Sequence, residues 1–157
     1  MWQKIKVYGT AIALPLAVGG LSALLTRNSM DIYDKINQPF LAPPSWLFPV
    51  VWTVLYILMG VSTGMIYESK QGEKADKKRA FLLYGINLFV NFLWSIIFFN
   101  LGSFLGAFLW LMLLIFILVK MVTAFNKIKP LAAYLQVPYI VWCCFASYLT
   151  ASIWLMN

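Results

Sequence analysis

The chain has 157 residues, of which 62% are hydrophobic and 11% charged, and its mean hydropathy is +0.82. This composition excludes a water-soluble globule and predicts an integral membrane protein in contact with a lipid bilayer. The net charge of +7 comes from cations that lie between long apolar runs, so we interpret them as topology markers and expect no nucleic-acid partner.

Five runs are long enough for a transmembrane helix, which needs about 20 apolar residues. The run 7–26 exceeds a signal-peptide core and lacks a clear cleavage site, so we expect a retained helix. Prolines at 39, 43, 44 and 49 place the start of the second helix between Ser45 and Pro49. The uncharged run 80–119 is divided by the turn residues 100–103.

Pro138 lies inside the last apolar run and predicts a kink in the fifth helix. The connections are short, so the helices must pack as near neighbours. The sequence therefore predicts an all-α membrane protein, a five-transmembrane-helix bundle in a single domain, 1–157, with spans at about 7–26, 45–67, 80–100, 103–125 and 131–156.

The loop charges predict an orientation. Ten of the 12 Lys and Arg residues lie at the N-terminus, in 68–79 or around the connection at 120–129, whereas only Arg27 and Lys35 lie on the other side. Cytoplasmic loops are enriched in Lys and Arg. We therefore predict a multi-pass protein of the cell membrane with its N-terminus inside and its C-terminus outside.

Small residues four apart favour close helix packing in lipid. Such pairs are Gly60 with Gly64, Gly102 with Gly106, Ala13 with Ala17, and Ser147 with Ala151. Contacts within the chain are the favoured interpretation for each pair, and a dimer face is the alternative.

Polar and aromatic side chains share faces on three spans, at a spacing of four residues. These faces carry Trp52, Tyr56, Gly60 and Thr63; Asn87, Asn91 and Ser95 beside Trp94; and Pro138, Trp142 and Ala146. Such faces suit a cavity for a flat, mostly apolar ligand. The alternative is that they only hold the helices together.

No predicted span contains Asp or Glu, and the chain lacks histidine. Proton-coupled transport ordinarily uses an intramembrane carboxylate, so this class of transporter is disfavoured. The two cysteines are neighbours in an apolar run, and with no histidine we expect no metal site and no required cofactor. The loop 28–44 is long and proline-rich, which is typical of a lid; Arg27 and Lys35 could meet a ligand carboxylate there, with pairing to Asp31 and Asp34 as the simpler interpretation.

Three segments resemble the translocator protein family, also called the tryptophan-rich sensory protein (TspO/MBR) or peripheral benzodiazepine receptor family. They are Ala42-Pro43-Pro44-Ser45-Trp46 with the following residues to Tyr56, Asn87-Leu88-Phe89-Val90-Asn91 with the residues to Ser95, and Val137-Pro138-Tyr139-Ile140-Val141-Trp142 with 145–149. The resemblance implies a five-helix bundle, commonly a homodimer, that binds protoporphyrin IX, haem-like tetrapyrroles and isoquinoline or benzodiazepine drugs. By the same resemblance the ligand-binding residues are Tyr33, Pro43, Trp52, Tyr56, Asn87, Asn91, Trp94, Trp142 and Ala146.

The resemblance leaves three functions open. We predict a membrane receptor or sensor that regulates porphyrin level or a stress response. The first alternative is a light- and oxygen-dependent porphyrin-degrading enzyme, in which Trp52 and Trp142 would be catalytic as electron donors; the second is a porphyrin transporter. The basic residue that ends the family's cholesterol-recognition pattern is missing after Tyr148, so we do not predict sterol binding.

Overall fold

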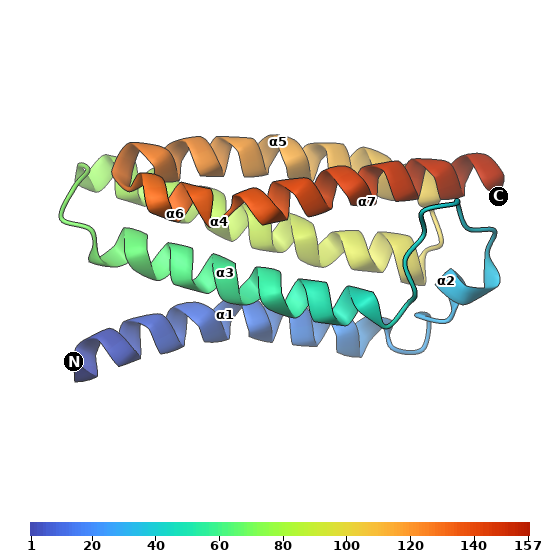
Figure 1. The fold of residues 1–157 in the computed structure, drawn as a ribbon, viewed down its shortest axis with the longest axis horizontal. Helices are drawn as coiled ribbons and strands as arrows, with labels where there is room; N and C mark the ends of the chain where they lie inside the picture. The colour runs from blue at the N-terminus through green and yellow to red at the C-terminus, as the bar shows by residue number, and fades with distance from the viewer.

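A computed structural model describes all residues, 1–157. Five helical segments are long and apolar enough to cross a membrane, which confirms the predicted fold class. They run side by side along the long axis, with α1 and α3 on one side of the bundle and α5 and α7 on the other (Figure 1). The helices are α1 (Trp2–Thr26), α2 (Ile32–Lys35), α3 (Leu47–Glu68), α4 (Lys74–Ser95), α5 (Phe104–Ile128), α6 (Pro130–Tyr134) and α7 (Val137–Met156).

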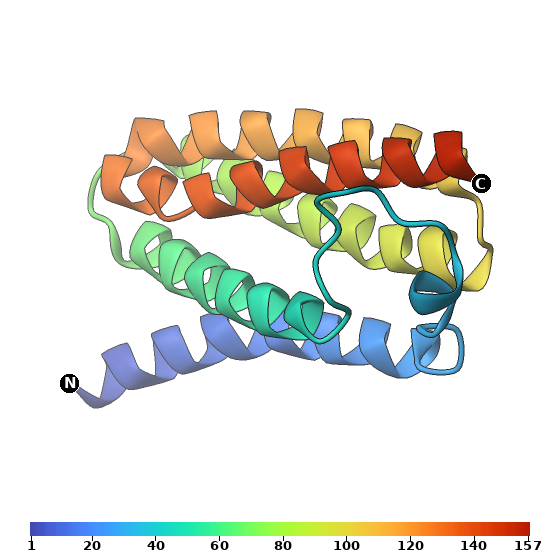
Figure 2. The same ribbon diagram turned by 45° about the vertical axis from the view of Figure 1, so that its right-hand side comes forward.

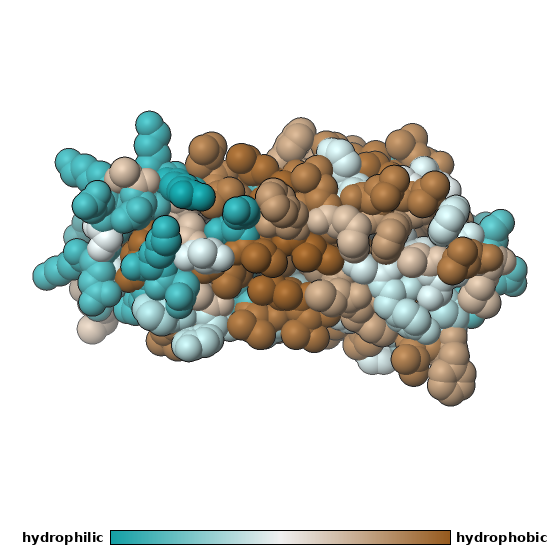
Figure 3. Space-filling view, turned by 90° about the horizontal axis from the view of Figure 1, so that it is seen from above, coloured by the Kyte–Doolittle hydropathy of each residue, from teal (hydrophilic) through white to brown (hydrophobic).

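The two ends of the bundle differ in what they carry. The N-terminus and the connection between α3 and α4 lie at one end, and α2, its loop and the C-terminus lie at the other (Figures 1 and 2). Hydrophilic side chains gather at the N-terminal end, next to an apolar band (Figure 3). This arrangement places the cation-rich segments together, as the topology argument requires, whereas the direction of the bundle across the cell membrane stays a prediction.

Helix boundaries follow local chemistry. α3 begins at Leu47, within the interval predicted from the prolines. α4 begins at Lys74, six residues before the predicted span, because Glu73 and Asp76 form a capping box that supports an extra turn and a half outside the membrane. Gly102 has φ of +60°, which lets the chain reverse between α4 and α5, as predicted.

Two features of the helices differ from the prediction. A π-helical turn, η1 (Ile96–Asn100), continues α4 up to the hairpin, and nothing in the apolar pattern indicates it. The fifth span is interrupted rather than kinked: α6 ends at Tyr134, and α7 begins at Val137 with Pro138 in its first turn. The physical reason is that Pro138 has no N–H to donate to a preceding carbonyl and its ring blocks the continuing turn.

The Gly60 and Gly64 pair packs within the chain, against α1. A Cβ added at Gly60 would lie 2.4 Å from the Cα of Ile12, and one added at Gly64 would lie 2.7 Å from the ring of Tyr8. This confirms the interpretation of this pair as an intramolecular contact. Ala13 and Ala17 instead lie exposed on α1, and dimer formation stays a prediction.

We expect Gly60→Leu to destabilise the protein by roughly 1–3 kcal/mol, the usual cost of overpacking, because the backbone of α1 cannot yield to the added side chain. Thermal unfolding of the protein in detergent measures this effect. Gly85→Leu is the control, since a Cβ at Gly85 meets nothing within 4 Å. Equal unfolding temperatures for the two variants would contradict the close α1–α3 crossing.

Candidate ligand-binding cavity

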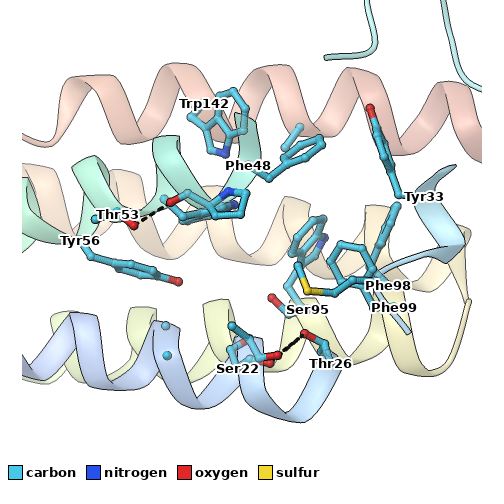
Figure 4. Close-up of a pocket in the computed structure, with 18 of the residues that line it drawn as sticks. Ser22, Thr26, Tyr33, Phe48, Thr53, Tyr56, Ser95, Phe98, Phe99 and Trp142 are labelled. Atoms are coloured by element: carbon cyan, nitrogen blue, oxygen red, sulfur yellow. Dashed lines mark hydrogen bonds between the residues drawn. The ribbon is translucent and has the colours of Figure 1, made fainter. Parts of the chain in front are cut away.

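A cavity of about 270 Å³ lies between α1, α3, α4 and α7, near the end that carries α2. Figure 4 shows the side chains that surround it. Its walls are aromatic: Trp52 and Phe48 come from α3, Trp94 from α4, and Trp142 from α7. No charged residue lines it.

The aromatic rings around the cavity contact one another in pairs. Trp52 stacks on Tyr56, with ring centroids 5.6 Å apart and planes 29° apart. Phe48 meets Trp142 edge to face at 5.8 Å, and Trp94 stacks on Phe98 at 5.3 Å. Rings held by neighbouring rings keep their orientation, so the cavity is preformed rather than collapsed.

Two indole groups at the cavity have no protein acceptor. The Nε1–H groups of Trp94 and Trp142 are buried and form no hydrogen bond. The hydroxyls of Thr26, Thr53 and Thr150 already donate to carbonyls of their own helices. An unpaired buried donor is costly, but both N–H groups are covered by neighbouring atoms, so an acceptor on a ligand reaches them only if the two side chains turn toward the cavity.

The loop between α1 and α3 covers the cavity at one end. Tyr33, in α2, is 3% exposed, donates from its hydroxyl to the carbonyl of Pro43 at 2.8 Å, and meets Phe48 edge to face at 5.0 Å. Burial, and to a smaller extent the charge of Asp34, raises the pKa of Tyr33 to about 12. The hydroxyl is therefore protonated at neutral pH and can hold the loop closed.

The loop is also fastened to the end of α7. Asn37 donates from its backbone N–H to Oδ1 of Asn157 at 3.0 Å, and Nδ2 of Asn157 donates to the carbonyl of Asn37 at 3.0 Å. Lys35 forms an exposed ion pair with Asp31, which is the simpler of the two interpretations of this cation. These contacts fit a lid that closes over the cavity.

Behind the cavity, a hydrogen-bonded network joins α3, α4 and α7. The hydroxyl of Tyr56 donates to Oδ1 of Asn91 at 3.3 Å, and Nδ2 of Asn91 donates to the hydroxyl of Tyr139 at 2.7 Å. That hydroxyl donates in turn to Oδ1 of Asn87 at 3.1 Å. Tyr56 lines the cavity and takes part in this network, so the network fixes one wall.

Six of the nine predicted ligand-binding residues line the cavity: Tyr33, Trp52, Tyr56, Trp94, Trp142 and Ala146. Pro43, Asn87 and Asn91 do not line it, because Pro43 supports Tyr33 from outside and the two amides face Tyr139 instead. Trp52 and Trp142, the two predicted electron donors, both line the cavity. Their role in catalysis stays a prediction.

The sequence did not lead us to expect that α1 lines the cavity. This helix supplies six lining residues: Leu16, Gly19, Gly20, Ser22, Ala23 and Thr26. The available signal was the pair Ser22 and Thr26, two polar residues four apart in an apolar run. Gly20 and Ala23 on α1, with Pro49 and Thr53 on α3, are both lining and exposed, so the cavity is open to the outside where these helices meet.

A bundle of five membrane-spanning helices, four of which surround this cavity, defines a multi-pass membrane protein with an internal aromatic pocket. The model of the TspO/MBR family matches residues 11–155. The chain therefore belongs to the TspO/MBR family.

Similar proteins come from bacteria and animals. The tryptophan-rich protein TspO of Chlorobaculum tepidum is 34% identical over all of this chain and 99% of its own length. The tryptophan-rich sensory protein of Cereibacter sphaeroides is 30% identical, with 90% of this chain and 83% of its own length covered. The human translocator protein is 29% identical, with 99% and 91% covered.

Proposed function

We propose that the protein is a membrane receptor that binds tetrapyrroles such as protoporphyrin IX in the aromatic cavity and senses their level. The observation that carries this proposal is the convergence of Trp52, Trp94 and Trp142 on one cavity, two of them with free indole N–H donors. A flat porphyrin ring stacks on such aromatic faces. Its carboxylates can accept hydrogen bonds from the indole N–H groups of Trp94 and Trp142 once these side chains turn toward the ligand.

The size of the cavity limits how a porphyrin can bind. Its volume of about 270 Å³ is just below the range of ligand pockets, which span roughly 300–1,000 Å³. A porphyrin therefore needs either the opening between α1 and α3 or a displacement of the loop that Tyr33 holds. The opening is present in the fold, and the loop lies outside the membrane-spanning helices, so the proposal does not require the bundle itself to open.

The sensory part of the proposal rests on two supports. The relative from Cereibacter sphaeroides is named a sensory protein. In addition, the lid contacts the cavity wall through Tyr33, which meets Phe48 of α3, and contacts the C-terminal residue through Asn37, so a ligand that moves Tyr33 would also change the surface at that end. Ligand binding would thereby change the protein surface outside the membrane.

Titration with protoporphyrin IX tests the proposal. We expect saturable quenching of tryptophan fluorescence at micromolar porphyrin. The affinity should be about tenfold lower for the double variant Trp52→Phe and Trp142→Phe, since each change leaves a smaller ring without an N–H donor and costs roughly 0.5–1.5 kcal/mol. The Soret absorbance of the porphyrin gives a second readout that does not depend on the number of tryptophans.

The matched control is Trp2→Phe with Trp154→Phe. It also removes two tryptophans, but these are 70% and 44% exposed and lie outside the cavity, so the affinity should stay at the wild-type value. Absence of saturable quenching in the wild-type protein would refute the proposed function.

A further inference from the structure

A second hollow lies at the opposite end of the bundle, between α4 and α5. It has a volume of about 170 Å³, and we call it the basic groove. It is lined by Asp76, Arg79, Val119, Lys120, Thr123, Ala124 and Lys127. The residues from α5 recur at intervals of three and four, so they form one face of that helix.

The basic groove has an excess of positive charge. Arg79, Lys120 and Lys127 face a single carboxylate, that of Asp76, and Asp76 accepts a hydrogen bond from the backbone N–H of Glu73 at the start of α4. The one ion pair in the structure, between Lys35 and Asp31, is at the other end of the bundle. Three cations therefore share the groove with one carboxylate, and none of the three forms an ion pair within the protein.

Lys120 lies well inside the end of α5, on an apolar part of the surface. Lys120 precedes the end of α5 at Ile128 by eight residues, which at about 1.5 Å per residue places it roughly 12 Å inside that end. Its ammonium lies 5.5 Å from the ring centroid of Phe116, which is 60% exposed. A cation at this depth on an apolar surface is costly without an anion nearby.

The rim of the basic groove points to a lipid rather than to a soluble anion. Val119 both lines the groove and is 48% exposed, beside the exposed ring of Phe116. Figure 3 shows that the hydrophilic end of the molecule borders directly on the apolar band. An occupant of the groove thus has a polar end among the cations and an apolar part along α5.

We propose that the basic groove binds the phosphate of an anionic phospholipid headgroup, with Arg79, Lys120 and Lys127 around the phosphate and the acyl chains along Val119 and Phe116. The guanidinium of Arg79 offers paired N–H donors that suit phosphate oxygens. The two lysines contribute point charges at the headgroup level. This site is separate from the aromatic cavity, and the proposal does not depend on what that cavity binds.

The test uses the delipidated full-length protein in detergent, with dioctanoyl phosphatidylglycerol, dioctanoyl phosphatidylcholine or inorganic phosphate added separately. Native mass spectrometry counts the bound lipids. We expect phosphatidylglycerol to bind roughly tenfold more tightly than phosphatidylcholine, and Lys120→Gln with Lys127→Gln to remove this preference, since each cation near an anionic headgroup contributes a several-fold factor. Both lysines are exposed, so the variant should fold.

The control variant is Lys70→Gln with Lys78→Gln, which removes two cations from the same end but outside the basic groove. It should keep the preference for phosphatidylglycerol. An equal loss in this control would show that total charge, not the groove, selects the lipid and would overturn the proposal. Displacement of phosphatidylglycerol by an equal concentration of inorganic phosphate would overturn the assignment to a lipid.

Discussion

Replacing Ala146 by tryptophan is expected to weaken protoporphyrin IX binding roughly 10- to 100-fold, because the new indole must occupy space that the ligand needs. Ala146 is 6% exposed and lines the cavity from α7. Overpacking of a filled site costs roughly 1–3 kcal/mol, and 1.4 kcal/mol is about one factor of ten in affinity. The measurement is the same fluorescence titration as for the wild-type protein.

The control for Ala146→Trp is Cys144→Trp. Cys144 lies two residues earlier on α7 and is exposed, so its replacement adds the same indole to the same helix outside the cavity. The affinity of this control should match that of the wild-type protein, and its unfolding temperature should too. If both variants bind porphyrin as tightly as the wild type, the cavity is not the binding site.

Tyr139→Phe is expected to lower the free energy of unfolding by about 1–3 kcal/mol. The change removes a hydroxyl that accepts from Asn91 and donates to Asn87, both buried, and each unsatisfied buried group costs about that much. Polar contacts in membranes average only about 0.6 kcal/mol each, which sets the lower end. A loss of 1 kcal/mol lowers the unfolding temperature by roughly 2–4 °C at this chain length.

Tyr134→Phe provides the comparison for Tyr139→Phe. Tyr134 is 68% exposed at the end of α6, so its hydroxyl has water or headgroups available, and the change should stay within about 0.5 kcal/mol. Tyr139→Phe should also weaken porphyrin binding a few-fold, since the network positions Tyr56 at the cavity. An unfolding temperature for Tyr139→Phe equal to that of Tyr134→Phe would contradict the network.

Hydropathy was sufficient to predict the five spans, and turn chemistry was sufficient for their main boundaries. The start of α3 after the prolines and the reversal at Gly102 depend only on nearby residues, which is why they could be predicted. The break at Leu135 and Gln136 could not be distinguished from a kink, because both outcomes satisfy the constraint that Pro138 imposes.

The residues of the candidate site could likewise be predicted only in part from the sequence. Spacing correctly placed Asn87 and Asn91 on one face of α4, but a periodic pattern does not tell which helix that face meets. In the structure it meets Tyr139, so the amides support the cavity wall instead of lining it. The part of the cavity made by α1 was missed because small residues such as Gly19 and Ala23 fit close helix packing equally well.

A structure of the full-length protein with protoporphyrin IX bound tests the central claim most directly. We expect the porphyrin ring to lie against Trp52 and Trp142, with its carboxylates or other acceptors within hydrogen-bond distance of the indole N–H groups of Trp94 and Trp142. Part of the ring should lie at the opening between α1 and α3 or beneath a displaced Tyr33. A porphyrin bound only on the lipid-facing surface, with the cavity unchanged, would contradict it.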